Sequence, residues 1–213
     1  MRGKRVVVVD YGMGNMLSVL NAFRYLGCEV EVTDDPLTIT TSSCLVLPGV
    51  GSFRKAMERI RLKHLDKALL EGVLERGTYL LGICLGMQLL FDFGTEEGGA
   101  EGLGLLRGIV ERFPEEEMKG LKIPHVGFNT VSMSRREGLF EEIPEDAGFY
   151  FVHSYRVTQR RKDDCNEAIC VYGAPFLAAV QRGNICGAQF HPEKSQSNGL
   201  LLLRNFLRMS DHC

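Results

Sequence analysis

Two kinds of hydrophobic pattern alternate along the first half of the chain. Short, continuous apolar runs rich in β-branched residues predict buried strands at residues 5–9, 43–51 and 79–84. Amphipathic stretches lie between them: residues 16–26 place apolar side chains at helical spacing, and residues 52–76 interleave apolar and charged positions. Apolar strands that alternate with helices predict a parallel sheet with helices on both faces.

The pattern changes at about Gly94. Residues 94–106 are rich in glycine and glutamate and predict a surface loop. Six strand-like segments follow, too closely spaced for crossover helices and so expected to be antiparallel: residues 108–113, 122–128, 148–157, 167–173, 176–183 and 184–190. Residues 195–210 predict a closing helix. We therefore expect an α/β fold in one domain over residues 1–213, flavodoxin-like, with a doubly wound, mostly parallel sheet and an antiparallel strand extension.

Charge and composition narrow the classes of partner and compartment. The chain has 25 basic and 27 acidic residues, a net charge of −2, which favours neither nucleic acid nor an anionic membrane. Seven cysteines occur without a Cys-x-x-Cys pair, so no structural zinc site, metal or cofactor is expected. The N-terminal apolar run stops at Asp10, short of the ~7–15 residues of a signal peptide, and no stretch approaches a membrane span of ~20 residues. A reducing compartment is expected, the cytoplasm or an organelle stroma.

One cysteine lies where an apolar strand changes into a helix. Residues 82–86, Gly-Ile-Cys-Leu-Gly, have the Gly-x-nucleophile-x-Gly spacing of a nucleophile elbow. The glycines would relieve crowding in the turn, and Cys84 would stand at the start of a helix, where free N–H groups stabilise a thiolate and an oxyanion. The carboxyl ends of parallel strands are where doubly wound sheets carry their reactive sites. The alternative is a core cysteine packed between glycines, and the motif alone does not separate the two.

A thiol nucleophile needs a base, and His191 is the candidate. It follows the apolar strand "ICGAQF", which we expect to expose the imidazole at an edge of the sheet. Pro192 stiffens the turn, so that Glu193 can fold back against the ring, set its tautomer and stabilise the imidazolium. The alternative is a strand-end histidine beside a surface glutamate. Of the other histidines, two are expected to be structural and two to lie on the surface: His125 and His153, and His64 and His212, respectively.

A glycine-rich turn supplies a third element. The segment "LPGVGSF", residues 47–53, follows a buried strand, and its two glycines let the backbone approach a ligand. The N–H groups of Val50 and Leu85 would then form a two-donor oxyanion hole. Alone, the segment predicts only a turn. Its strand is the one before the Cys84 strand in chain order, and this favours its assignment to the oxyanion hole.

Taken together, these segments resemble a known family. "GICLGMQ", "LPGVGSF", "QFHPEKS" and "DYGMGN" are similar to the motifs of the class I, triad-type glutamine amidotransferases. With "PHVGFN" and "FYFVHSYR", they are most similar to the glutaminase subunits of imidazole glycerol phosphate synthase, an enzyme of histidine biosynthesis. The resemblance runs from about Val6 to Leu207. The combination is specific, whereas any single motif is not.

The resemblance implies hydrolysis of glutamine to glutamate and ammonia. Cys84 would attack the side-chain amide and form a γ-glutamyl thioester, which water then cleaves. His191 would move the protons, and Glu193 would orient His191. Backbone N–H groups of two loops would hold the oxyanion: those of Val50 and Leu85, with Gly51 in the same loop as Val50.

The resemblance also assigns the substrate contacts. Gln88, one helical turn after the cysteine, would bind the amino-acid end of glutamine, and Gly51 lies in the substrate loop. Glu96 is the candidate partner of the substrate ammonium, although Glu97 could serve. Ser154 and Tyr155 match the family's substrate-contacting pair. The alternatives are a surface amide at Gln88 and a packed aromatic at Tyr155: these residues would then have no role in binding.

Free ammonia would be diluted and mostly protonated in water, and the family avoids this by docking on a synthase. The resemblance implies a heterodimer with a separate (β/α)8-barrel cyclase that receives the ammonia through a channel. Five residues would lie near this contact: Met13, Gly14, Asn15, Phe128 and Lys194. "PHVGFN" has Val126 and Phe128 where the family usually carries methionine and tryptophan. Phe128 keeps an aromatic ring but lacks the indole N–H, which puts a hydrogen bond across the interface in doubt.

Three other interpretations are open from the sequence. The chain could be a glutaminase that feeds another synthase, such as those for anthranilate or pyridoxal phosphate. It could be a cysteine hydrolase that acts alone on peptides or esters. It could be a docking subunit without activity, but a scaffold has no need for the whole Cys-His-x-Glu set.

Overall fold

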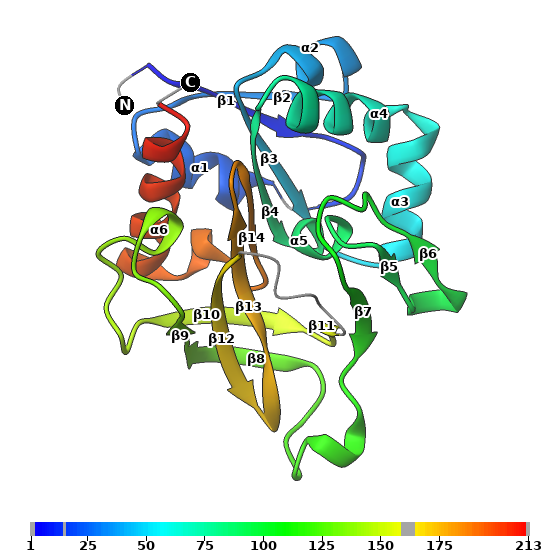
Figure 1. The fold of residues 1–213 in the computed structure, drawn as a ribbon, viewed down its shortest axis with the longest axis vertical. Helices are drawn as coiled ribbons and strands as arrows, with labels where there is room; N and C mark the ends of the chain where they lie inside the picture. Colours follow the sequence, from blue (N-terminus) through cyan, green and yellow to red (C-terminus); the bar gives the residue numbers. More distant parts are fainter. Residues whose placement is uncertain (1–2, 15, 159–164, 212–213) are drawn as a thin grey trace.

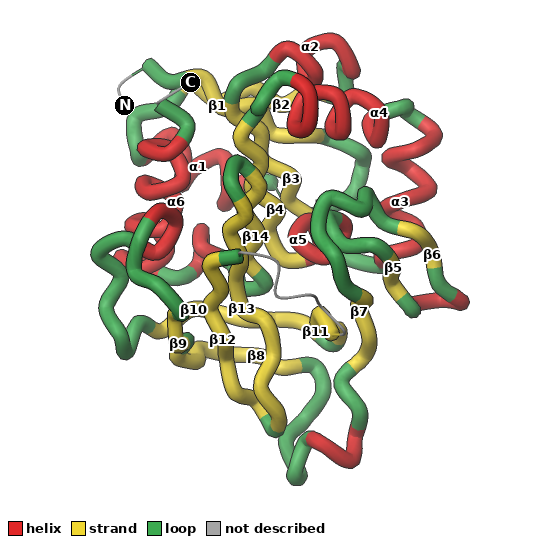
Figure 2. The backbone as a smooth tube through the Cα atoms, viewed as in Figure 1, coloured by secondary structure: helices red, strands yellow, loops and turns green. Residues whose placement is uncertain are grey.

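An eight-stranded sheet forms the centre of the protein, with the strand order β2-β1-β3-β4-β14-β13-β12-β9 (Figures 1 and 2). The computed structural model describes residues 3–14, 16–158 and 165–211. Five neighbouring strands pair in parallel: β2 (Glu29–Thr33), β1 (Arg5–Val9), β3 (Cys44–Gly49), β4 (Tyr79–Cys84) and β14 (Ile185–Ala188). Three strands extend the sheet by antiparallel pairing: β13 (Ala174–Arg182), β12 (Asn166–Tyr172) and β9 (Ser132–Met133).

The alternation of side chains along β1 shows how both faces of this sheet become buried. Val6 and Val8 belong to one apolar cluster, and Val7 and Val9 belong to another on the opposite face. The first cluster is covered by α1 (Leu17–Tyr25) and α6 (Gln196–Met209). The second is covered by α2 (Pro36–Thr41), α3 (Phe53–Leu62), α4 (Leu65–Leu70) and α5 (Leu85–Leu89). The predicted doubly wound α/β fold is confirmed.

The helices follow the predicted pattern with one addition. Residues 52–76 form α3, α4 and a π-helical turn at Glu71–Glu75. Helix α2 was not predicted, although its N-terminus carries a signal: Asp35 accepts a hydrogen bond from the Thr38 N–H at 2.9 Å, and Pro36 occupies the first turn. Across the described ranges, no helix is long and apolar enough to cross a membrane.

One strand expected in the antiparallel extension lies in the parallel sheet instead. β14 follows β13 through a two-residue turn at Gly183 and Asn184 and then pairs in parallel with β4, with Ala188 opposite Ile83. All four residues of β14 are buried, as in the interior of a sheet. The predicted antiparallel pairing is confirmed for β13, but close spacing along the chain does not reveal the parallel partner β4 on the other edge. The ends of β4 and β14 therefore lie side by side.

Two smaller sheets stand across the carboxyl ends of the parallel strands (Figure 1). One pairs β10 (Gly148–His153) with β8 (His125–Thr130). The other contains β11 (Tyr155–Thr158), β7 (Ile109–Arg112), β5 (Phe93–Gly94) and β6 (Ala100–Glu101), and β5 pairs with β7 in parallel. The remaining ordered turns are 3-10 helices at Glu96–Gly98, Glu115–Glu117, Gly138–Phe140 and Pro192–Lys194.

Residues 94–106 are not the surface loop that their glycines and glutamates predicted. The segment begins at the end of β5, turns through Glu96–Gly98 and forms β6. Leu103, Leu105 and Leu106 are buried in the apolar cluster that α3 and α5 also cover. Three well-placed leucines therefore decide the position of a segment whose average composition is polar.

Candidate active site

Cys84 occupies a sharp turn between β4 and α5. Its backbone has φ +54° and ψ −110°, a left-handed value that a non-glycine residue adopts only when its surroundings impose it. A Cβ on Gly86 would lie 1.7 Å from the Leu47 carbonyl oxygen, and one on Gly82 would lie 2.7 Å from that of Gly86. Gly86 lets the turn pack against β3, and Gly82 lets β4 pack against the start of α5; this packing holds Cys84 in its strained conformation.

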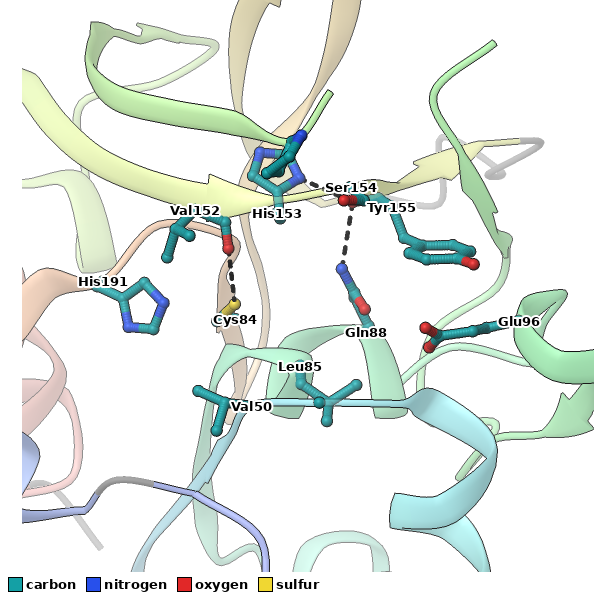
Figure 3. A pocket seen from close by; sticks show the side chains of 12 residues that line it. Val50, Cys84, Leu85, Gln88, Glu96, Val152, His153, Ser154, Tyr155 and His191 are labelled. Carbon is teal, nitrogen blue, oxygen red and sulfur yellow. Dashed lines mark hydrogen bonds between the residues drawn. The ribbon is translucent and has the colours of Figure 1, made fainter. Parts of the chain in front are cut away.

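The Cys84 side chain lines a cavity of about 350 Å³, although only 7% of the residue is exposed. The cavity brings together the predicted oxyanion and substrate residues and adds three that were not predicted, Pro124, Val152 and His153. The complete lining is Val50, Gly51, Cys84, Leu85, Gln88, Glu96, Pro124, Val152, His153, Ser154, Tyr155 and His191 (Figure 3). The signal for the three additional residues was present, because they lie inside the quoted segments "PHVGFN" and "FYFVHSYR".

His191 lines the same cavity as Cys84, and Glu193 holds its imidazole ring. The imidazole Nδ1 and Glu193 Oε1 are 2.7 Å apart, and both side chains are 5% exposed or less. Glu193 can only accept when ionised, so Nδ1 carries the proton and Nε2 is free to act as a base. Within the described residues Nε2 has no hydrogen-bond partner, and Figure 3 shows this edge of the ring turned toward Cys84.

The burial of His191 differs from the predicted exposure at a sheet edge. The residue is 4% exposed because it lies beyond the end of β14, in a turn whose backbone is tied down on both sides. Its N–H donates to the Tyr150 carbonyl at 2.8 Å, and the Ser195 hydroxyl donates to the His191 carbonyl at 2.6 Å. Its side chain borders the cavity and a small cleft that Glu193 also lines.

Opposing effects act on the charge of His191. Burial disfavours the imidazolium, but the sulfur of Cys84 and the carboxylate of Glu193 outweigh burial and raise the pKa of His191 to about 9. Within the described residues Nε2 forms no hydrogen bond with the sulfur, so the attraction between the two groups is electrostatic. The site therefore favours a protonated His191 next to the sulfur at neutral pH.

The far side of the cavity carries an amide and a carboxylate. Gln88 is 6% exposed, and its Nε2 donates to the Tyr155 carbonyl at 3.2 Å. Glu96 Oε2 accepts from the Phe53 N–H at 2.7 Å, which holds the carboxylate at the start of α3. Burial and the nearby Glu96 charge raise the pKa of Tyr155, so its hydroxyl stays protonated.

The structure separates the two glutamates that the sequence left open. Glu96 lines the cavity, whereas Glu97 lies outside its lining and binds the N-terminal turn of α3. The Ser52 hydroxyl donates to Glu97 at 3.0 Å, and Lys55 pairs with it at 3.3 Å. A cationic group in the cavity would therefore meet Glu96.

The glycine-rich turn after β3 borders the same cavity. Val50 is 45% exposed, and Gly51 has φ +108°. A Cβ on Gly51 would lie 2.8 Å from the terminal methyl of Met13, so Met13 packs directly over this turn. The Val50 turn and the start of α5 at Leu85 thus stand on the same side of Cys84 (Figure 3).

Most of the predicted partner contacts gather near the cavity at the surface. Phe128 is 54% exposed, and its ring meets the edge of Tyr150 at 5.6 Å, while Lys194 lies 5.8 Å above that same ring. Gly14 is exposed and borders a small cleft with Glu193. Asn15, also predicted for this contact, lies outside the described residues.

The other histidines have different surroundings. His125 and His153 are buried and hydrogen-bonded to each other at 3.2 Å between Nδ1 and Nε2, as expected for structural residues. His64 is exposed, as predicted for a surface residue, and it turns the chain between α3 and α4 with φ +58°. His212 lies outside the described residues. Within the described part of the chain, no group of three or more potential ligands is placed to hold a metal ion.

Comparisons with known proteins agree with this geometry. The family model for class-I glutamine amidotransferases matches residues 7–209. The imidazole glycerol phosphate synthase subunit HisH of Moorella thermoacetica is 48% identical over 207 residues, which cover 97% of this chain and 96% of the relative. The subunit of the same name from Geobacter sulfurreducens is 43% identical and covers 96% and 99% of the two chains.

Solved structures share the fold at lower sequence identity. PurLQS from Thermotoga maritima superposes with a TM-score of 0.69 at 20% identity, covering 97% of this chain and 98% of that one. A glutamine amidotransferase from Thermotoga maritima gives a TM-score of 0.66 at 18% identity, covering 99% of this chain and 100% of that one. At this identity the likeness concerns the fold alone.

Proposed function

The chain belongs to the class-I glutamine amidotransferases, and within them to the HisH subunits of imidazole glycerol phosphate synthase; from this premise we propose that it hydrolyses glutamine for a cyclase subunit. The ammonia would serve the synthesis of imidazole glycerol phosphate and AICAR in histidine biosynthesis. One observation carries the proposal: Cys84, His191 and Glu193 meet at one side of a cavity whose other side presents Gln88 and Glu96.

We infer that proton transfer from Cys84 to His191 starts the reaction. Glu193 holds the Nδ1 proton, so Nε2 takes the proton from the sulfur, and a pKa of about 9 keeps that proton on the ring at neutral pH. The thiolate then attacks the side-chain amide carbon of glutamine. The carbonyl electron pair moves to oxygen, and the negative charge of this tetrahedral intermediate needs donors close by.

Two backbone donors are proposed for this charge, the N–H groups of Val50 and Leu85, with Gly51 giving the first loop its freedom. The intermediate collapses when His191 Nε2–H protonates the amide nitrogen, so that ammonia leaves and a thioester to Cys84 remains. Water that gives a proton to Nε2 then attacks the thioester. Glutamate departs, and the thiolate and imidazolium are restored.

The polar groups opposite the sulfur fit the other end of glutamine. The Glu96 carboxylate would bind the α-ammonium group, because it borders the cavity and is held there by the Phe53 N–H. Gln88, Ser154 and Tyr155 would complete the contacts to the amino-acid end. These groups are held by three separate elements, which supports a cavity selective for a substrate with charges at a set distance from its amide.

We propose that the product ammonia leaves through a heterodimer with a (β/α)8-barrel cyclase. The exposed Phe128 ring on β8, the half-buried Tyr150 ring on β10 and the nearby cation of Lys194 support a docking face next to His191 and Glu193. Its proposed members are Met13, Gly14, Asn15, Phe128 and Lys194. Among the described residues, five buried cysteines are free thiols: Cys28, Cys44, Cys84, Cys170 and Cys186. This supports a reducing compartment such as the cytoplasm, and we treat residues 1–213 as one functional domain.

Substitution of Cys84 tests the proposal. In the complex with the cyclase and its nucleotide ligand, Cys84→Ala should abolish synthesis from glutamine and leave synthesis from added ammonium salt within twofold of the wild type. Loss of both activities would mean that Cys84 is needed for folding or assembly instead. Absence of glutamine hydrolysis by the wild-type complex would overturn the proposed function itself.

A further inference from the structure

Gln189 is a buried amide next to the nucleophile that the proposed reaction does not use. It lies after β14, two residues before His191, and is 0% exposed. Its Nε2 lies 3.8 Å from the Cys84 sulfur, and its Oε1 accepts a hydrogen bond from Gln88 Nε2 at 2.9 Å. Gln189 thus connects the sulfur to a residue on the far wall of the cavity.

The orientation of the Gln189 amide follows from the Tyr155 carbonyl oxygen, whose role in a hydrogen bond is fixed. The Tyr155 backbone carbonyl can only accept, so the group of Gln88 that faces it at 3.2 Å must be the NH₂ group. The other hydrogen of that NH₂ group points at Gln189, which must therefore present its oxygen to Gln88. The NH₂ group of Gln189 is left facing Cys84.

A second donor fixes the Tyr155 carbonyl from its other side. His153 Nδ1 lies 2.8 Å from this oxygen and so carries its proton there, and His153 Nε2 accepts from His125 Nδ1–H at 3.2 Å. Every bond in the network then has one permitted direction. Such a network resists the flip of any single amide, because a flip would set two donors or two acceptors against each other.

The Cys84 sulfur has another polar neighbour that acts in the opposite sense. The Val152 carbonyl oxygen lies 3.9 Å from the sulfur, where a neutral thiol can donate to it and a thiolate is repelled by it. The N–H of Gln189 is the group on this side that favours the thiolate. Of the titratable groups near the sulfur, His191 supplies positive charge, while burial raises the pKa of Tyr11 and keeps it neutral.

We propose that Gln189 is a positioning residue that stabilises the Cys84 thiolate through its N–H and sets the orientation of Gln88 in the substrate cavity. The inference rests on the proposed function in so far as Cys84 is the nucleophile. It makes a separate claim, that the ionisation of Cys84 depends on an amide that never touches the substrate. Because both Gln88 hydrogens are used inside the protein, only Gln88 Oε1 is available to the substrate, as an acceptor.

The test is the pH dependence of Cys84 alkylation in Gln189→Met, which keeps the length of the side chain and removes the donor. Iodoacetamide labelling of the whole chain is followed by peptide mass mapping between pH 5 and pH 10. The midpoint of the Cys84 rate should move upward by about one pH unit, since a hydrogen bond to a charged group is typically worth that much. In the cyclase complex, kcat for glutamine should fall about 10–100-fold, with a smaller change in KM.

Two further variants keep the test decisive. Gln189→Glu retains the shape but sets an oxygen against the sulfur, so its midpoint should move further than that of Gln189→Met. Gln181→Met is the matched control, because the Gln181 amide on β13 serves the backbone N–H of Leu139, away from the sulfur; its alkylation profile should match the wild type. Coincident profiles for wild type, Gln189→Met and Gln189→Glu would overturn the inference. Alkylation does not require glutamine turnover, so failure of the proposed function would leave this result intact.

Discussion

Two buried histidines of this protein have pKa values shifted in opposite directions: His191, which pairs with Glu193, and His153, which pairs with His125. His191 and His153 both line the same cavity and are 4% and 6% exposed. Burial lowers the pKa of His153 to about 3 and that of its partner His125 to about 4, whereas the pKa of His191 is raised to about 9. Equal burial therefore does not decide the charge of an imidazole.

The partners of each ring explain the difference. His153 meets a carbonyl and a second neutral imidazole, and neither offers a full negative charge to an imidazolium. His191 meets the Glu193 carboxylate at 2.7 Å and faces the sulfur of Cys84. In a medium of low dielectric a full opposite charge at hydrogen-bond distance exceeds the cost of burial, and a dipole does not. The surroundings of His191 therefore suit proton transfer, whereas those of His153 suit a neutral ring that donates a hydrogen bond to the Tyr155 backbone carbonyl.

Removal of the proposed base should have the largest effect on catalysis. We expect His191→Ala to lower glutamine turnover of the cyclase complex by about 10³–10⁴-fold, because no other described imidazole faces the sulfur. Ammonium-dependent synthesis is the control and should stay within twofold of the wild type. A loss of less than tenfold would mean that another group takes the proton, and the contrast with His153 would then disappear.

Neutralisation of the Glu193 carboxylate should remove the difference in pKa between His191 and His153 while keeping the His191 ring. Glu193→Gln should lower turnover by about 10²–10³-fold, because an amide can stabilise the wrong tautomer and no longer attracts the imidazolium. The pKa of His191 should fall well below its raised value. Titration of the ring by NMR with ¹⁵N-labelled histidine measures this shift; a pKa that stays near 9 would show that Cys84 alone holds the charge.

Acid should destabilise the protein through the buried pair His125 and His153. The unfolded state binds protons on His125 and His153 near pH 6.5, and the folded state does so only near pH 4 and pH 3. Their contribution to stability is therefore complete above pH 6.5 and is lost as the pH falls through the folded values. At about 1.4 kcal/mol per pH unit for each of the two groups, we expect a loss of up to about 7 kcal/mol between pH 7 and pH 4. Urea unfolding followed by circular dichroism at a series of pH values measures it.

The smallest effect should come from His125→Phe. The ring stacks on Tyr172 at 3.9 Å and on Phe151 at 4.8 Å, and phenylalanine can keep these contacts while losing the N–H donor to His153. We expect a loss of about 1 kcal/mol at pH 7, a shallower decline in acid, and kcat within twofold of the wild type. A large fall in kcat would show that this pair also takes part in catalysis.

The elements of the fold could be predicted because their signals are local. The strands at residues 5–9 and 79–84 and the closing helix follow from apolar runs and helical spacing within the segments themselves. The place of β14 beside β4 could not be predicted in this way, because strand order depends on which surfaces fit together over the whole chain. The same holds for residues 94–106, where the polar average hid three buried leucines.

In the candidate site, too, the features that depend on neighbouring residues could be predicted, and those that depend on distant segments could not. The spacing in Gly-x-Cys-x-Gly and His-Pro-Glu determines a strained turn and a carboxylate that folds back on its own histidine, because both arrangements need only neighbouring residues. Neither the choice of Glu96 over Glu97 nor the network through Gln189 is visible in such spacing. These depend on side-chain directions set by the packing of distant segments.

The sequence by itself determined most of the helices and strands, the elbow at Cys84 and the local pairing of His191 with Glu193, since each depends on contacts within a few residues. Only the tertiary structure decided that the ends of β4 and β14 lie side by side and that β10 and β11 cross above them. That arrangement sets the partners of every buried polar group. Partners at hydrogen-bond distance, and not burial, determine which imidazole is charged and which atom of Gln189 faces the sulfur.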